Sequence, residues 1–289
     1  MRVAVIGSGI SGLSSAYFLN RNFDVHLFER DHRIGGHSHT VDADFNGVKV
    51  AVDTGFIVYN PLNYPNLVSM FAHLDVPWIE TDMSFAVSLR EGGCEYEGSL
   101  SGFVAQPGNL LRSRYWTMLS NLVRFYRTGY RAAFDGPADE SLAQFLNREG
   151  YATAFVEDHL LPMGAAIWSC SAHTMLDYPV RSLLQFMENH KLLNFIDRPK
   201  WRTVKGGSRE YVRRIADALG GEDGDRIHLG THITGLRREQ GGVILSIAGE
   251  GDVWFDKVVM AAHADQSLAM ISDATTAEHD ILSSFRFQP

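Results

Sequence analysis

The first twenty residues constrain the fold more strongly than any other part of the chain. Residues 3–6 are a continuous apolar run, which is typical of a parallel strand buried on both faces. Gly7, Gly9 and Gly12 follow with the spacing G-x-G-x-x-G, and residues 11–20 have a helical pattern. In such a unit the first glycine permits a tight turn, the second lets a pyrophosphate approach the backbone, and the third lets the helix pack on the strand. The segment predicts a dinucleotide at the helix N-terminus.

An acidic residue stands where a ribose would need it. The second apolar strand, residues 24–29, ends at Glu29, about 20 residues past the glycines, where a carboxylate accepts hydrogen bonds from ribose hydroxyls. Arg30 could instead contact a 2′-phosphate, but Glu29 disfavours that charge, and a solvated strand end is the simpler role for Arg30. A purely structural glycine turn is the alternative, and the register of strand, glycines, helix, strand and acid argues against it.

A second glycine pair distinguishes between FAD and NAD. Gly35 and Gly36 come directly after the second strand, where main-chain N–H groups can reach the oxygens of an extended cofactor. A simple NAD-linked dehydrogenase has no use for this pair. The sequence therefore favours FAD.

At this point the sequence resembles the FAD-dependent amine oxidoreductase family, the flavin-containing amine oxidases, in which an acid is followed by R-x-G-G-R. The resemblance rests on "ERDHRIGGHSHT" and continues in "VDTGFIVYN", "WRTVKGGSR" and "DKVVMAAHADQS". The wording is most similar to a bacterial subgroup of predicted NAD/FAD-binding amine-oxidase-like proteins, some of which are associated with acyl-lipid modification. His37 replaces the usual second arginine, so a fixed positive charge becomes a smaller, titratable donor.

The resemblance implies which residues lie against FAD. It places residues 54–57 along the flavin ring and the backbone near Ile233 beside the adenine. Together with the glycine motif, the expected cofactor-binding residues are Gly7, Ser8, Gly9, Ile10, Ser11, Gly12, Glu29, Arg30, Gly35, Gly36, His37, Thr54, Gly55, Phe56, Ile57 and Ile233.

The expected fold class is α/β. A Rossmann-like FAD-binding domain, with a parallel sheet and attached antiparallel strands, is interrupted by a mainly helical substrate or cap domain. The expected bounds are 1–78 and 201–265 for the FAD-binding domain and 79–200 for the substrate domain, which opens with a hairpin about Gly92 and Gly93. Residues 266–289 begin a return to the substrate domain and end in "ILSSFRFQP", a helix followed by the start of a strand. We therefore expect the natural polypeptide to continue.

A bound flavin would carry the redox chemistry, so no catalytic residue is assigned. The expected reaction is hydride transfer from a C–H bond of an apolar small molecule, an acyl lipid or a polyene-like compound, with an amine as the open alternative. The helical insertion is rich in aromatic and thioether side chains, most of which we expect in its core, while small residues beside Trp168 leave room for substrate. Asn189 and His190 are further polar candidates. An NAD-linked dehydrogenase, a flavin-bound isomerase and a non-catalytic cofactor-binding partner protein are the competing interpretations.

Composition excludes several classes of function. The formal net charge of −8 disfavours nucleic-acid binding. Cys94 and Cys170 form no C-x-x-C pair, and His37 with His39 lacks a third ligand, so neither a disulfide framework nor a metal site is predicted. No apolar run is long enough to span a membrane, and no export leader is recognised, so a cytoplasmic location is expected. Peripheral membrane contact stays open, and the oligomeric state is not predicted.

Overall fold

The structure is a computed structural model that describes residues 1–168, 170–196, 198–222, 224–285 and 287. The chain divides into two compact units. The first unit comprises Met1–Tyr59, Asn66–Glu80 and Arg202–Pro289, and the second, which we call the helical unit, comprises Asn60–Pro65 and Thr81–Trp201.

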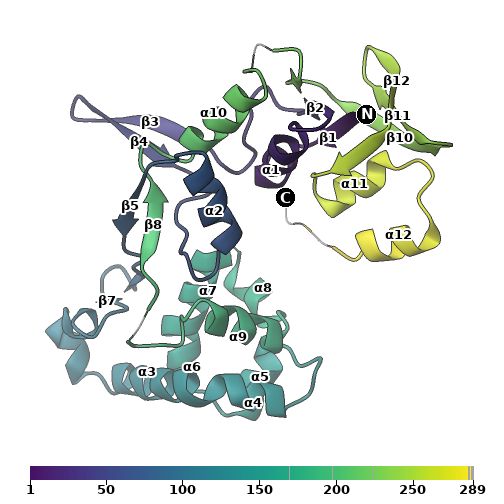
Figure 1. Cartoon of the computed structure of the whole chain (residues 1–289). Helices are drawn as coiled ribbons and strands as arrows, with labels where there is room; N and C mark the ends of the chain where they lie inside the picture. Colours follow the sequence, from purple (N-terminus) through teal and green to yellow (C-terminus); the bar gives the residue numbers. More distant parts are fainter. Residues whose placement is uncertain (169, 197, 223, 286, 288–289) are drawn as a thin grey trace. The chain divides into compact units, whose positions relative to one another are not determined.

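A four-stranded parallel sheet forms the centre of the first unit. Its order is β13 (Lys257–Met260), β1 (Arg2–Ile6), β2 (Asp24–Phe28) and β9 (Ile227–His228). Parallel neighbours need a crossover, and α1 (Ile10–Leu19) supplies it between β1 and β2. The predicted strand–glycine–helix–strand unit is therefore present, and β1 lies inside the sheet (Figure 1).

The two faces of this sheet are covered differently. Helix α1 packs on β1 and β2 and contacts α10 (Arg209–Ala218). Alternate side chains of β1 and β2 point away from α1 and join a core with an antiparallel sheet. That sheet consists of β10 (Ile233–Glu239), β11 (Gly242–Ile247) and β12 (Gly251–Phe255), and the shared core contains Ala4, Ile6, Phe28, Leu236, Leu245, Ile247 and Phe255. Helices α11 (Ala264–Met270) and α12 (Thr276–Leu282) follow β13.

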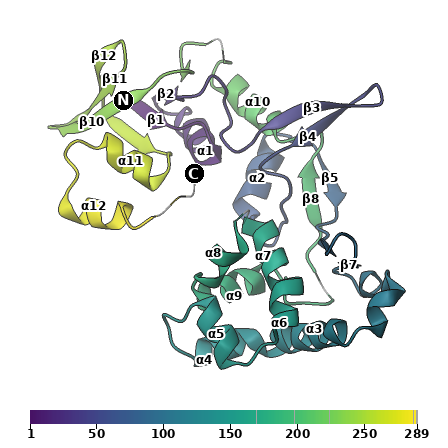
Figure 2. The same ribbon diagram turned by 180° about the vertical axis from the view of Figure 1, so that it is seen from behind.

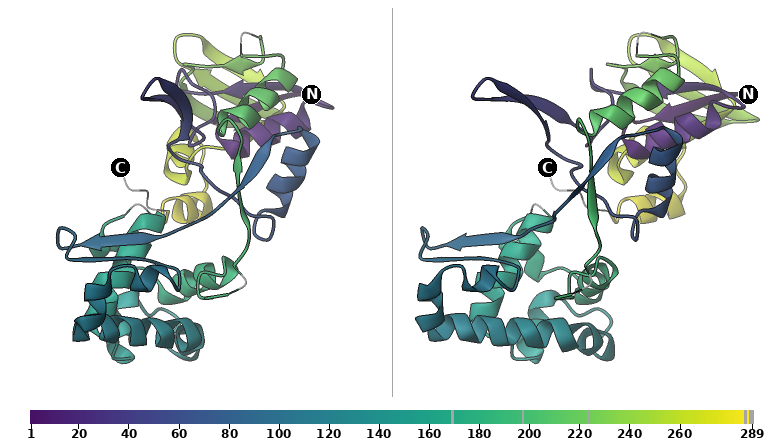
Figure 3. Two further views of the ribbon diagram at one scale, coloured as in Figure 1. Left: turned by 90° about the vertical axis from the view of Figure 1, so that its left-hand side faces the viewer. Right: turned by 60° about the vertical axis from the view of Figure 1, so that its left-hand side comes forward.

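The remaining elements of the first unit are two-stranded ribbons and one helix. Strands β3 (Thr40–Phe45) and β4 (Val48–Asp53) form a hairpin that stands apart from the parallel sheet (Figure 3). Helix α2 spans Pro65–His73. Strands β5 (Trp78–Thr81) and β8 (Trp201–Val204) pair in a further ribbon.

The helical unit begins with a hairpin and continues as helices around one core (Figure 2). The hairpin pairs β6 (Ala86–Leu89) with β7 (Cys94–Glu97). The helical segments are η1 (Gly102–Val104), η2 (Pro107–Leu111), α3 (Ser113–Arg124), η3 (Phe125–Gly129), α4 (Tyr130–Asp135), α5 (Leu142–Arg148), α6 (Thr153–Phe155), η4 (Val156–Leu160), α7 (Leu161–Trp168), α8 (Ala172–Leu176) and α9 (Val180–Asn189). Side chains such as Met118, Phe125, Phe145, Phe155 and Met187 are fully buried among them.

The observed elements confirm the expected fold class and several local predictions. Helix α1 occupies the predicted position, and the β6–β7 hairpin turns at Gly92 and Gly93. The structure also shows a capping box at the start of α5, formed by Ser141 and Gln144. Near the end, α12 spans Thr276–Leu282, so only the first two residues of "ILSSFRFQP" are helical. The strand start expected after the helix falls partly on residues 286, 288 and 289, outside the described residues. Within the described ranges, no helix is both long and apolar enough to cross a bilayer.

Candidate cofactor-binding site

In the glycine loop between β1 and α1, the space beside Gly9 is open, whereas the space beside Gly12 is filled by backbone. A Cβ atom at Gly12 would lie 1.8 Å from the carbonyl oxygen of Gly7, so the helix can approach the strand only with glycine there. A Cβ atom at Gly9 would meet nothing within 4 Å. No side chain caps α1, which begins at Ile10, so its first N–H groups remain available to an anion.

Glu29 is held against this loop from the adjacent strand. It follows the last residue of β2, and its Oε2 accepts hydrogen bonds from the Ser8 N–H (2.8 Å) and the Ser8 hydroxyl (2.6 Å). Its Oε1 accepts one from the N–H of Asp31 at 3.0 Å. The carboxylate thus lies at the carboxyl end of the sheet beside the glycine loop, the position that a ribose-binding acid needs.

The second glycine pair packs directly on the first motif. The Gly35 N–H donates to the carbonyl and to the hydroxyl oxygen of Ser8, both at 3.1 Å. Gly36 has φ +57°, and a Cβ atom there would lie 2.8 Å from the Cα of Gly9. Any larger residue at position 36 would therefore clash with the backbone of Gly9.

The segment after β4 follows the loop that contains His37. The Thr54 N–H donates to the His39 carbonyl (2.9 Å), and the Phe56 N–H donates to the His37 carbonyl (3.3 Å). Between them, a Cβ atom at Gly55 would lie 2.1 Å from the His37 carbonyl oxygen. These contacts therefore connect the glycine loop, Glu29, the Gly35–Gly36 pair and the start of the 54–57 segment into one continuous surface.

Three of the expected residues lie outside this connected set. The Arg30 side chain is 65% exposed, and its nearest acid is Asp31 at 3.9 Å, as expected for a solvated strand end. Ile57 is half exposed and accepts a hydrogen bond from Thr203 through its carbonyl. Ile233 buries its side chain in the core beneath β1 and β2, so only its backbone is free to face a ligand.

Hydrogen bonds of Asp53 join the end of the β3–β4 hairpin to the start of α10. Its carboxylate accepts from the Ser208 N–H (2.9 and 3.0 Å), the Ser208 hydroxyl (2.8 Å) and the Thr40 hydroxyl (2.5 Å). Outside this buried network, Arg209 makes a bidentate ion pair with Asp42 and lowers the pKa of that carboxyl mainly through its hydrogen bonds. The positions of the β3–β4 hairpin and of the 54–57 segment after it thus depend on a polar network that joins distant parts of the sequence.

Sequence reasoning missed several residues that shape this surface. The Arg33 guanidinium donates hydrogen bonds to the carbonyls of Ile34, Gly36 and Ser38 and so stabilises the conformation of this loop. The ring of His263 stacks on His37, with centroids 6.0 Å apart. Arg33 had a signal, because it is the first arginine of the R-x-G-G pattern. His263 lies in the matching segment "DKVVMAAHADQS", but only the tertiary fold shows that it reaches the loop.

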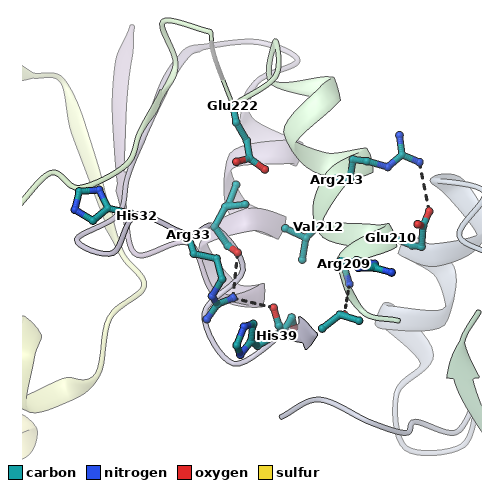
Figure 4. A pocket seen from close by; sticks show the side chains of 11 residues that line it. His32, Arg33, His39, Arg209, Glu210, Val212, Arg213 and Glu222 are labelled. Atoms are coloured by element: carbon teal, nitrogen blue, oxygen red, sulfur yellow. Dashed lines mark hydrogen bonds and ion pairs between the residues drawn. The ribbon is translucent and has the colours of Figure 1, made fainter. Parts of the chain in front are cut away.

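A cavity lies on another side of the same loop, between residues 32–40 and α10 (Figure 4). It measures about 560 Å³ and is lined by His32, Arg33, Ile34, Ser38, His39, Thr40, Arg209, Glu210, Val212, Arg213 and Glu222. None of the expected cofactor residues lines it. The polar lining is largely self-paired: Arg213 contacts Glu210 at 3.3 Å, and the buried Ser38 hydroxyl hydrogen-bonds Tyr211. We therefore do not assign the cofactor to this cavity.

At Gly164, one of the small residues before Trp168, the structure fills the space that the sequence predicted to be open. The small residues before Trp168 were expected to leave room for substrate, but a Cβ atom at Gly164 would lie 2.7 Å from the terminal methyl of Met175. Trp168 packs on Phe186, and the ring of His190 stacks on the same phenyl group. The flexible Met175 thioether occupies the space that glycine opens, which a sequence pattern cannot reveal.

His159 is a buried histidine for which the sequence analysis assigned no role. It is 1% exposed, and its Nδ1 lies 3.0 Å from the hydroxyl of Tyr96. The hydroxyl of Tyr126 lies 3.4 Å from its Nε2. Burial, with a smaller contribution from the positive charge of Arg198, lowers the pKa of His159 to about 4. The imidazole is therefore a neutral part of the core at ordinary pH.

A sheet with β1 inside it, a glycine-rich turn at its carboxyl edge and an acid on the adjacent strand define a dinucleotide-binding protein of the Rossmann-like class. The model of the family described as flavin-containing amine oxidoreductase matches residues 10–280. The chain belongs to this family, which confirms the resemblance and the flavin class of cofactor expected from the sequence. A search of curated proteins finds no match.

Solved structures show the same fold at low sequence identity. Putrescine oxidase bound to putrescine superposes with a TM-score of 0.71 at 17% identity, covering 98% of this chain and 63% of that protein. Cyclohexylamine oxidase from Brevibacterium oxydans gives 0.70 at 17% identity, with 98% and 62% covered. The CLA-producing fatty acid isomerase from P. acnes gives 0.59 at 18% identity, with 98% and 63% covered. The chain thus spans less than two thirds of the length of these structural relatives.

Proposed function

We propose that the chain binds FAD on the connected surface of the first unit and belongs to an oxidoreductase that acts on C–H bonds of an apolar substrate. The observation that carries the proposal is the convergence of Gly9, Gly36 and Glu29. Gly36 packs against the backbone of Gly9, the Cβ direction of Gly9 is open, and a carboxylate fixed by Ser8 lies beside them. A side chain at position 9 would enter this open space, and a side chain at position 36 would displace the Gly9 backbone.

Each group on the surface has a distinct part in holding the cofactor. Glu29 accepts hydrogen bonds from ribose hydroxyls, and the free N–H groups at the start of α1 bind pyrophosphate oxygens. His37, Thr54, Gly55 and Phe56 present backbone toward the remainder of the cofactor. Bound FAD would accept a hydride from the substrate.

The charges buried in the helical unit favour an apolar substrate over an amine. Among the described residues of this unit, the buried acids are Glu140 and Asp158. Glu140 pairs with Arg148 at 2.8 Å, and Asp158 pairs with Arg90 and Arg114 at 2.8 and 2.7 Å. Neither carboxylate is left to bind an ammonium group. An acyl lipid or polyene-like substrate therefore suits this unit better, and a fatty acid isomerase among the structural relatives is in keeping with such a ligand.

The test uses the whole product of the gene. Its visible spectrum should show bound flavin, and anaerobic mixing with unsaturated acyl lipids should bleach that spectrum, whereas putrescine and cyclohexylamine should leave it unchanged. Rapid reduction by the amines alone would overturn the apolar substrate class. Rearranged acyl product without bleaching would favour an isomerase.

Two further outcomes test the cofactor itself. Purified protein that retains NAD and no flavin would overturn the cofactor assignment. Bound flavin that no candidate substrate reduces, together with tight binding to another protein, would favour the non-catalytic role.

A further inference from the structure

One segment of the helical unit has a charge opposite to that of the whole chain. Between Gly98 and Phe134 there are five arginines and no aspartate or glutamate, in a chain with a formal net charge of −8. This segment runs from η1 through η2 and α3 into α4. Helices α3 and α4 lie along one edge of the helical unit in both principal views (Figures 1 and 2). We call this segment the cationic strip; within it Arg114 is neutralised by Glu157 and Asp158, and the other four arginines carry its positive charge.

The cationic strip also exposes large apolar side chains. Leu111 is 90% exposed, Leu100 is 74% exposed and Trp116 is 55% exposed. The Trp116 indole donates to the carbonyl of Leu110 at 2.8 Å, which holds its ring beside the η2 turn that ends at Leu111. The aromatic residues of the neighbouring sequence, such as Tyr115 and Phe125, are buried as expected. Trp116 is therefore a departure from the core pattern, and packing within the helical unit does not explain it.

The exposed face of α3 that carries Trp116 extends along the chain toward Arg127 and Arg131. Positions 116, 120, 123 and 127 follow the four-three-four spacing that brings residues onto one side of a helix, and all four are exposed. Arg131 is one turn further along and its nearest acid is Asp135, with both side chains largely in solvent. Among the described residues, Arg127 has no ion-pair partner within 4.0 Å. These two charges cost little to move toward an external anion, because strong internal partners do not hold them.

We infer that the surface formed by Leu111, Trp116, Arg127 and Arg131 docks this protein onto a phospholipid bilayer that contains anionic lipids. Leucine and tryptophan side chains enter the interface between headgroups and acyl chains, and arginines bind the phosphates at the same level. Nucleic acid would also attract the arginines, but its backbone offers no site for exposed leucines. The inference does not rest on the proposed substrate.

The direct test is flotation of the whole gene product with vesicles. We expect binding to vesicles of phosphatidylcholine mixed with phosphatidylglycerol, weaker binding at high salt, and little binding to pure phosphatidylcholine. Equal partition into both kinds of vesicle, or no partition into either, would overturn the inference.

Matched variants then test the surface itself. Arg127→Ser and Arg131→Ser should each reduce partition into the anionic vesicles about fivefold. Leu111→Ser should reduce it about tenfold through the loss of apolar insertion. Arg213→Ser and Arg237→Ser remove the same charge from exposed sites of the first unit, and Ile281→Ser removes an exposed apolar side chain there. These controls should leave partition unchanged.

Two results would contradict the assignment of this surface. Controls that weaken binding as much as the test variants would mean that total charge, rather than this surface, governs it. Arginine-dependent binding to single-stranded RNA without binding to vesicles would replace the bilayer by nucleic acid. Circular dichroism of each variant establishes that the fold is intact, since all the substituted side chains are exposed.

Discussion

Gly9 and Gly12 belong to one sequence motif but have different physical roles. Space around Gly12 is filled by the Gly7 carbonyl, whereas space around Gly9 is open. Gly12→Ala should therefore destabilise the first unit, because the helix must move away from the strand. Gly9→Ala should leave the melting temperature almost unchanged and reduce FAD affinity at least tenfold, since its methyl group points where the pyrophosphate approaches.

Thermal denaturation and FAD titration of the two variants separate these effects. If Gly9→Ala bound FAD normally, the open space beside Gly9 would not be the phosphate site. If Gly12→Ala kept full stability, the close packing of α1 on the glycine loop would be wrong.

Glu29 offers a second test at the residue scale. Charge-assisted hydrogen bonds contribute roughly 1.5–3 kcal/mol, so Glu29→Ala should raise the dissociation constant of FAD roughly 10- to 100-fold. The matched control is Asp24→Ala, which removes the same charge from the exposed, opposite end of β2. Isothermal titration of both variants checks this prediction, and equal losses would mean that overall charge is responsible.

At the scale of elements, Asp53 joins the β3–β4 hairpin to α10. Asp53→Ala leaves the Ser208 N–H and hydroxyl buried without their acceptor, and should lower the free energy of unfolding by roughly 2–3 kcal/mol. Asp42→Ala removes the exposed ion pair with Arg209 and should have a much smaller effect. Urea denaturation monitors both, and similar losses for the two variants would rule out a special role of the Asp53 network.

The helical unit should become less stable in mild acid because of His159. Its pKa is lowered to about 4 in the folded state, whereas an unfolded histidine titrates near 6.5. Between these values the unfolded chain binds the extra proton, so stability is full above about pH 6.5 and falls toward pH 4. The loss approaches 1.4 kcal/mol per pH unit within this window.

The variant His159→Phe should flatten this pH dependence. Tyr96 keeps its hydrogen bond to the Asp158 carbonyl at 2.6 Å, so the variant leaves that hydroxyl satisfied. Asp158 stays ion-paired with Arg90 and Arg114, which separates its own titration from that of the imidazole. Unfolding followed between pH 4 and pH 7 checks the prediction, and a slope that persists in the variant would assign the effect to other groups.

Local patterns in the sequence were sufficient to predict many helices and strands, but not the tertiary contacts between them. The β1–α1–β2 unit and the hairpin at Gly92 depend on residues close together in sequence, so patterns predicted them. Asp53 and Ser208 are 155 residues apart, and their network follows only from the fold. The space at Gly164 likewise depends on Met175, a neighbour that no periodicity identifies.

At the scale of the whole molecule, FAD should protect the first unit selectively. A ligand that binds only the folded state stabilises it by about 2.7 kcal/mol at a concentration 100 times its dissociation constant. Amide hydrogen exchange should therefore slow in residues 7–12 and 35–37 when FAD is added, with little change along α3. Protection confined to α3, or uniform over the chain, would contradict the proposed cofactor site.

The late position of strand β13 in the sequence affects how the protein folds during its synthesis on the ribosome. It completes the sheet on one side of β1, pairing Val3 with Lys257, and the carbonyl of Ala261 closes in on Gly7. At a synthesis rate of about 5–20 residues per second, β1 waits roughly 10–50 s for that neighbour. Most of the helical unit is one continuous stretch, Thr81–Trp201, and emerges complete before then. Cofactor capture is therefore a late event, and a nascent chain passes through a period in which one edge of β1 is exposed to chaperones or to other strands.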